Sequence, residues 1–179
     1  MGEHICFRRN ERLATVNPHW RGNPVVRGKF VNRQHRFRPG MGSVLKWRLS
    51  PNPQRKEKKS VKWNPKLNYL RSLDGVVGNS LIWLGHNSFF LQLARKRIMF
   101  DPVFGDIPFV KRQSDFPANP DIFTDIDYLL ISHDHFDHLD KQSVARLVKN
   151  NPGMKLFCGL GTGAVSYTHL RAHETGAYL

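Results

Sequence analysis

Short apolar runs separated by polar or glycine-containing breaks organise the second half of the chain. Residues 81–84, 88–93 and 97–100 are rich in Ile, Leu, Phe and Trp, with breaks at Gly85 and at the polar tip 94–96. Runs of this length with breaks of this kind predict β-strands. Residues 126–132, IDYLLIS, form a continuous apolar run, which is typical of a buried strand.

A helix is predicted directly after this buried strand. In the segment 140–153, DKQSVARLVKNNPG, Asp140 is expected as the N-cap, Val144 and Leu147 share one helical face, and Asn-Pro-Gly ends the helix. Residues 155–160, KLFCGL, read as another short strand. Several strands followed by a strand–helix–strand unit predict a mixed α/β layer sandwich.

The first 80 residues have a different character. They contain 18 Lys and Arg against 4 Asp and Glu, whereas residues 81–179 contain 10 of each, so the whole formal net charge of +14 lies in residues 1–80. Apolar periodicity is weak in residues 1–60, where one short helix is predicted at 42–49, ended by Ser50 and Pro51. We therefore expect a basic N-terminal extension, residues 1–80, ahead of the α/β domain.

A basic extension of this kind suits a phosphate-bearing surface, and a solvated arm that aids solubility is the alternative. Because Trp20, Trp47 and Trp63 are interspersed among the basic residues, we expect residues 1–80 to make peripheral contact with an anionic membrane. Nucleic acid is not expected as a partner, since the extension has neither a base-stacking motif nor a recognition-helix pattern.

The cysteines and the apolar runs bear on location. Cys6 and Cys158 lie far apart and in no paired spacing, which fits a reducing compartment. The first residues show no apolar run of the secretory type, and no stretch approaches the roughly 20 apolar residues of a membrane-spanning helix. We therefore expect a cytoplasmic location, with peripheral membrane contact.

The strongest chemical signal is the segment 131–140, ISHDHFDHLD, which holds three histidines and three aspartates. His133 and His135 are two apart, so an extended backbone directs both imidazoles the same way. Asp137 and His138 can then turn toward a second point nearby. The loop offers two nitrogens to one cation and a carboxylate with a nitrogen to another, a combination that zinc favours. A polar loop whose histidines pair with aspartates is the alternative.

The run HDHFDH resembles the His-x-His-x-Asp-His signature of the metallo-β-lactamase superfamily. The stretches IWLGHNSFFLQL, IMFDPVFG and DYLLISHDHFDHLD resemble the branch that contains N-acyl-phosphatidylethanolamine-hydrolysing phospholipase D and ascorbate-6-phosphate lactonase-like proteins, over about residues 21–163. The chain departs from that pattern at Asn87 and Ser88, where many relatives have Ala-Thr. The resemblance implies an αββα sandwich, with its N-terminal half at residues 81–164.

The same resemblance implies a ligand set for two divalent metal ions, with zinc as the expected metal. His133 and His135 would bind the first ion, and Asp137 and His138 the second. Asp137 is also the residue expected to take part in catalysis. A hydroxide held between two such ions can attack a phosphorus or carbonyl centre.

Other residues near the motif are expected to support these ligands. Asp101 would orient a ligand histidine, and a turn residue before Pro102 is the alternative. His86 is expected to support or pack against the ligand residues and not to bind metal itself. Asp134 and Phe136 occupy the variable positions of the motif and are expected to face solvent and the core, respectively.

The function that the resemblance implies is metal-dependent hydrolysis of a phosphodiester, of the phospholipase D type, with a small molecule or a phospholipid as substrate. A lactone hydrolase is the alternative within the enzymes. A nucleic-acid-binding or nuclease member of the same fold is the other alternative.

The C-terminal run VSYTHLRAHET, residues 165–175, carries His169 and His173 one helical turn apart, a spacing that suits a zinc pair. The run also matches a translated transposon-end sequencing adapter, so we interpret residues 165–179 as a non-native tail. The further ligands of the family would then be missing, and two ligands cannot close a tetrahedral zinc site. We expect such a chain to bind metal weakly, to leave a sheet face uncovered, to aggregate and to be inactive.

Overall fold

The computed structural model describes residues 4–11, 18–31, 40–61, 66–107, 111–112, 114–160 and 162. The chain divides into two compact units, Met1–Asn64 and Pro65–Leu179. Residues 66–80 belong to the second unit, although the sequence pattern placed them in the basic extension. The reason is packing, because Leu73 is 3% exposed within the core of the second unit and Leu70 packs against that core.

The first unit contains a three-stranded antiparallel sheet, which the sequence pattern did not predict. Its strands are β1 (Cys6–Arg8), β2 (Asn23–Val26) and β3 (Lys29–Phe30), in the order β1-β2-β3. Arg27 and Gly28 join β2 to β3 with φ angles of 50° and 77°. Positive φ at both residues is the requirement of the tight turn that suits the twist of a hairpin.

Two helices follow in the same unit. Helix α1 (Met41–Leu49) confirms the helix predicted at 42–49, and α2 (Arg55–Ser60) comes after the Pro51–Pro53 segment. No residue of α1 is buried. Among the described residues, no helix has the length and apolar character needed to cross a membrane.

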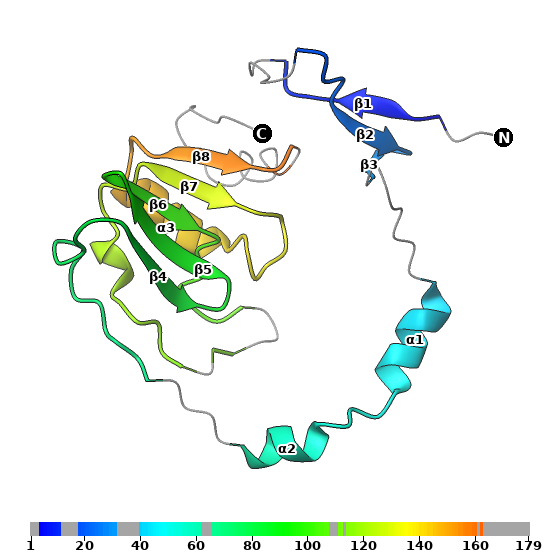
Figure 1. The fold of residues 1–179 in the computed structure, drawn as a ribbon, viewed down its shortest axis with the longest axis horizontal. Coiled ribbons are helices and arrows are strands. Elements are labelled where there is room, and N and C mark those ends of the chain that lie inside the picture. Colours follow the sequence, from blue (N-terminus) through cyan, green and yellow to red (C-terminus); the bar gives the residue numbers. More distant parts are fainter. Residues whose placement is uncertain are drawn as a thin grey trace. The chain divides into compact units, whose positions relative to one another are not determined.

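The second unit is built on one five-stranded sheet in the order β4-β5-β6-β7-β8 (Figure 1). The strands are β4 (Ser80–Gly85), β5 (Ser88–Leu93), β6 (Lys96–Phe100), β7 (Tyr128–Ile131) and β8 (Lys155–Cys158). The first three strands pair antiparallel, whereas β6, β7 and β8 pair parallel. All five strands lie where the sequence pattern predicts them, and the mixed α/β prediction is confirmed.

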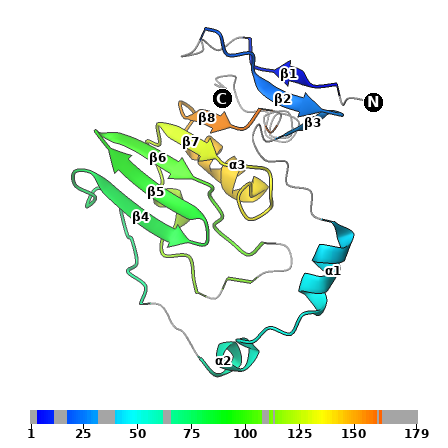
Figure 2. The same cartoon turned by 45° about the vertical axis from the view of Figure 1, so that its right-hand side comes forward.

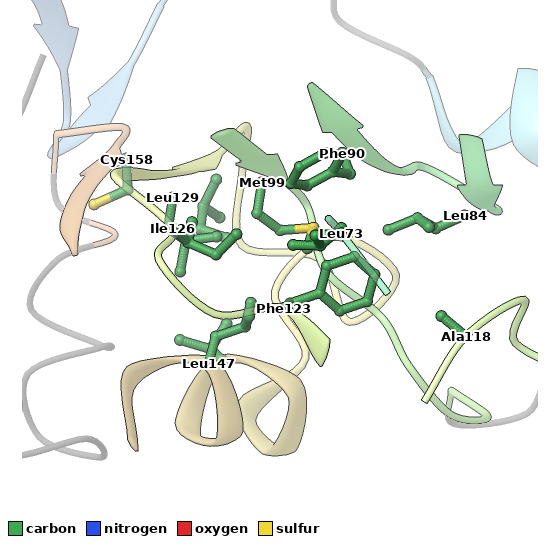
Figure 3. Close-up of a cluster of buried hydrophobic side chains, with 12 residues drawn as sticks. Leu73, Leu84, Phe90, Met99, Ala118, Phe123, Ile126, Leu129, Leu147 and Cys158 are labelled. Atoms are coloured by element: carbon green, nitrogen blue, oxygen red, sulfur yellow. The ribbon is translucent and has the colours of Figure 1, made fainter. Parts of the chain in front are cut away.

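Helix α3 (Lys141–Asn150) connects β7 to β8 and lies against one face of the sheet (Figure 2). The Asp140 carboxylate accepts a hydrogen bond from the backbone N–H of Ser143, so the predicted N-cap is confirmed. Val144 and Leu147 are 0% and 1% exposed, as the predicted apolar face requires. Figure 3 shows Leu147 among the buried side chains that join the helix to the sheet.

The loop between β6 and β7 closes the core at the end of α3. It contains the short 3-10 helix η1 (Pro120–Ile122). Asn151 is buried and donates hydrogen bonds to the carbonyls of Phe123 and Leu147 at 2.8 and 2.9 Å, and its Oδ1 accepts one from the N–H of Ile126 at 2.9 Å. One side chain thus satisfies three backbone groups and ties the loop to the helix.

The opposite face of the sheet is also apolar. Two rows of directly paired residues cross it, Leu81, Leu91, Ile98 and Tyr128 in one and Trp83, Phe89, Phe100, Leu130 and Phe157 in the other. Leu81 and Trp83 are 66% and 55% exposed. Strands with apolar residues on both faces are typical of a sheet that packs between two layers.

Candidate metal centre

The candidate site lies at one edge of the five-stranded sheet. Strands β4, β6, β7 and β8 run in the same direction, because β4 and β6 are both antiparallel to β5 and the last three strands are parallel. The residues that follow β4, β6 and β7 therefore meet at this edge. They include His86, Asp101 and the motif loop that begins at Ser132. Loops beyond the carboxyl ends of parallel strands are the usual place for a ligand site in α/β folds.

The motif loop curls tightly after β7. The backbone N–H groups of His138 and Leu139 both donate to the carbonyl of His135, at 3.0 and 2.8 Å. This turn gathers three imidazoles, with ring centroids of His133 4.5 Å from His135 and 3.9 Å from His138. The Nε2 atom of His133 lies 3.0 Å from Nδ1 of His135. The structure thus brings together the two histidines that the sequence assigns to one ion.

Asp101 follows β6, and its side chain contacts the motif loop. Its carboxylate accepts hydrogen bonds from the N–H of Ser132 at 2.7 Å, from the Ser132 hydroxyl at 2.6 Å and from Nδ1 of His138 at 2.8 Å. Its own backbone N–H donates to Leu130, and its carbonyl accepts from the buried hydroxyl of Ser88. Asp101 is 7% exposed and has a φ of 40°. These contacts are those of a carboxylate that orients a ligand histidine.

The hydrogen bonds fix which nitrogen of each ring carries a proton. A carboxylate only accepts, so Nδ1 of His138 carries a proton, and in the neutral ring Nε2 keeps its lone pair. The Ser132 hydroxyl donates to Asp101 and can therefore accept from Nδ1 of His133, which lies 2.9 Å away. The lone pair of His133 then also lies on Nε2. In both rings the lone pair then lies on the nitrogen that is not bonded to the Asp101–Ser132 network.

His86 lies in the turn between β4 and β5 with a φ of 51°. Its Nε2 is 3.1 Å from Oδ2 of Asp137, and the indole of Trp83 donates to its carbonyl. The hydrogen bond from His86 lowers the pKa of Asp137, with the smaller opposing effect coming from partial desolvation. An ionised carboxylate is the form that binds a cation. His86 thus contacts one of the four expected ligands.

Two polar residues in the site had no role assigned to them from the sequence. Ser132 bridges Asp101 to both His133 and His138, and it ends the apolar β7 run immediately before the motif. Asn87 lies with its Nδ2 2.9 Å from Nε2 of His138. The sequence signals that could have identified them are the position of Ser132 next to the histidine-rich loop and the position of Asn87 next to His86.

One expectation about the motif is wrong. Phe136 is 70% exposed and does not enter the core. The tight turn at 135–139 places this position on the outside of the loop, so a large apolar side chain faces solvent beside the candidate ligands. Asp134 is exposed, as expected. His169 and His173 of the C-terminal tail lie outside the described residues.

The donors fit a divalent cation in type, because neutral imidazole nitrogens and a carboxylate are zinc-type ligands. The four residues are His133, His135, Asp137 and His138. Within the described residues, no group of three or more His, Cys, Asp or Glu side chains is placed to hold a single ion. The hydrogen bonds of Asp101 and Ser132 set the orientation of the His133 and His138 rings.

Comparison with known proteins gives a consistent assignment. Residues 80–175 match the family model described as the β-lactamase superfamily domain. The chain is 29% identical to N-acyl-phosphatidylethanolamine-hydrolyzing phospholipase D 1 of Caenorhabditis elegans, over 77% of this chain and 43% of that protein. It is 36% identical to a metal-dependent hydrolase of Sulfolobus acidocaldarius, over 43% of this chain and 31% of that protein. The chain thus spans less than half the length of these relatives.

A solved structure of a mutant of the β-hydroxylase CmlA also resembles the chain, with 18% identity and a TM-score of 0.40 over 76% of this chain and 26% of that one. That likeness is too low to support any argument. The family match runs to residue 175, and the non-native origin of residues 165–179 stays a prediction. Because the family model covers more than half of the chain, including the sheet and the histidine-rich loop, the chain belongs to the metallo-β-lactamase superfamily.

Proposed function

We propose that the protein carrying this chain is a metal-dependent hydrolase. The observation that supports this most is the arrangement of Asp101, Ser132, His133 and His138, in which two ligand-type rings present lone pairs while their other nitrogens are held by hydrogen bonds. The names of two similar proteins, a phospholipase D and a metal-dependent hydrolase, agree with this proposal.

The residues of the site have separable roles in this proposal. His133 and His135 would hold one divalent ion, and Asp137 and His138 a second one, with zinc as the proposed metal. Ions bound there would polarise the scissile bond and lower the pKa of a water molecule. Asp101 and Ser132 hold the proton of each ring on Nδ1, and the hydrogen bond from His86 orients Asp137 and lowers the pKa of its carboxyl.

The proposed substrate is a phosphodiester, and specifically a phospholipid whose headgroup is released. The similarity to a phospholipase D supports this choice. The basic first unit supports it as well, because a positively charged segment of the same chain attracts a phosphate-bearing surface.

The test is an assay of the gene product with zinc on three substrates, namely phospholipid vesicles, a sugar lactone and single-stranded RNA. We expect chelator-sensitive headgroup release that is lost in Asp137→Asn and retained in Asp134→Asn, which changes a neighbouring exposed carboxylate. Lactone opening or RNA cleavage in place of headgroup release would assign the alternative substrates. No chelator-sensitive activity on any substrate would contradict the hydrolase proposal.

A peripheral membrane role for the first unit is part of the same proposal. Met41, Leu45, Trp47 and Leu49 of α1 are 85%, 59%, 78% and 74% exposed, which is unusual for large apolar side chains. The groove beside them has a volume of about 750 Å³ and is lined by Val44, Trp47, Arg48, Ser50, Pro51, Asn52 and Pro53. Exposed apolar side chains, tryptophan above all, suit the boundary between lipid headgroups and acyl chains.

Basic residues lie close to these apolar residues in the sequence. Lys46 and Arg48 lie on α1 itself, and Arg55, Lys56 and Lys59 lie on α2. Each basic residue near an anionic membrane contributes about 1 kcal/mol of attraction. We therefore assign the α1–α2 segment to the surface of an anionic membrane, with the protein in the cytoplasm. Trp63, which the sequence analysis included, lies outside the described residues.

Vesicle co-sedimentation tests this role. Binding should require anionic lipid, fall with rising salt and weaken in Trp47→Ala, whereas Val77→Ala, which removes an exposed apolar side chain from the second unit, should bind normally. Equal binding of Trp47→Ala and the unaltered chain, or binding to purely zwitterionic vesicles, would contradict the assignment.

A further inference from the structure

Asn87 lies between the two side chains that would bind the second ion. Its Nδ2 is 2.9 Å from Nε2 of His138 and 3.5 Å from Oδ2 of Asp137. It comes directly after His86, in the turn that joins β4 to β5. Most of the contacts in the site lie behind the ligand rings, on the side of Asp101. Asn87 instead contacts the atoms that would face a metal ion.

The direction of this hydrogen bond follows from the network behind it. Asp101 accepts from Nδ1 of His138 at 2.8 Å, so the proton of that ring lies on Nδ1. Nε2 then has a lone pair and can only accept. The group that faces it must be a donor, which is the Nδ2 amide of Asn87. The same amide has Oδ2 of Asp137, another acceptor, as its second neighbour.

We infer that Asn87 is a gate on the second metal position, and this inference rests on the proposed metal-binding role of Asp137 and His138. Its amide contacts the same acceptor atoms that an ion would need. A cation can bind this pair only after the Asn87 side chain has turned away. Asn87 therefore lowers affinity at the second position.

This role is particular to the residue present here. Alanine has no donor that could occupy the nitrogen of His138. The substitution Asn87→Ala shortens the side chain to a methyl group. It removes the competing hydrogen bond without removing any proposed ligand.

The size of the effect follows from the energy of one hydrogen bond. A net value of about 0.6 to 1.4 kcal/mol corresponds to a change in affinity of about three- to tenfold. We expect Asn87→Ala to bind zinc at the second position tighter by about this factor, with the first position unchanged. The matched control is Asn150→Ala, which removes an amide on α3 that contacts Asp121 far along the chain.

Calorimetric titration of the 179-residue chain with zinc alone measures the difference in affinity between Asn87→Ala and the unaltered chain. Independently, the NMR signals of the Asn87 side-chain amide in the unaltered chain show whether zinc binding displaces this amide. The inference expects tighter binding in Asn87→Ala and a shift of the Asn87 amide signals as zinc binds. Equal or weaker zinc binding in Asn87→Ala, or amide signals that zinc leaves unchanged, would contradict the proposed role of Asn87. Neither result would contradict the proposed metal site itself. Absence of zinc binding in every form would overturn both proposals.

Discussion

Replacing Asp101 by asparagine tests the network that organises the site. The substitution keeps the size of the side chain. It also keeps the backbone, because Asn tolerates the left-handed region, where Asp101 has a φ of 40°, about as well as Asp. One oxygen remains for the N–H of Ser132. The NH₂ group that replaces the other oxygen meets the Ser132 hydroxyl and Nδ1 of His138, at distances that were 2.6 and 2.8 Å.

Two hydrogen bonds to a buried carboxylate are therefore lost. Each such bond contributes about 1.5–3 kcal/mol. Removing a buried charge lowers the desolvation cost and offsets part of the loss. We expect the free energy of unfolding to fall by about 2–4 kcal/mol. The amide donor also forces the proton of His138 from Nδ1 to Nε2, so affinity for metal should fall by about 10- to 100-fold.

Urea denaturation followed by tryptophan fluorescence measures the change in stability, and long-range proton–nitrogen NMR identifies the protonated nitrogen of His138. The control is Asp125→Asn, since Asp125 also has a positive φ, of 55°, but its side chain is 86% exposed. The control should change stability by less than about 0.5 kcal/mol. An Asp101→Asn variant as stable as the control, with His138 still protonated on Nδ1, would refute the reasoning about the network.

Three further predictions concern the rest of the second unit. Asn151→Ala leaves three buried backbone groups without their partner, so urea denaturation should show a loss of about 2–4 kcal/mol, and an unchanged midpoint would contradict this. The hydrogen bonds from Arg146 lower the pKa of Asp121, so this pair stabilises the fold above about pH 4 and the stabilisation is lost as pH falls through the lowered pKa. The stability difference between the unaltered chain and Asp121→Asn should therefore shrink between pH 7 and pH 3, and a constant difference would contradict it. Leu81→Lys combined with Leu93→Lys places charges on the exposed apolar sheet face, so light scattering should show less association, and equal association would show that this face is not the contact surface.

Much of the second unit could be predicted from local pattern. The apolar runs gave all five strands, and Asp140 marked the start of α3, because strand alternation and N-capping are properties of a few neighbouring residues. The first sheet was missed because its strands are two to four residues long, too short for periodicity to be visible. The Arg27–Gly28 turn between them was the available signal.

The ligand set of the site stays a prediction, and the sequence also predicted that Asp101 orients a histidine but not the contacts of Asn87 and Ser132. His133, His135, Asp137 and His138 follow from spacing within one loop. The contacts of Asp101 and Asn87 with that loop join residues 37 and 51 positions from His138, and such contacts depend on strand order. Phe136 was misplaced because alternation along an extended strand does not continue into a tight turn.

The central claim is that the loop after β7 binds divalent metal ions, and imidazole NMR during a zinc titration of the chain tests it most directly. His4 and His19 of the first unit serve as internal references. The account predicts that zinc shifts the ring signals of His133, His135 and His138 and leaves the two reference histidines unchanged. Motif signals that stay unchanged at saturating zinc, or that shift only together with the references, would contradict it.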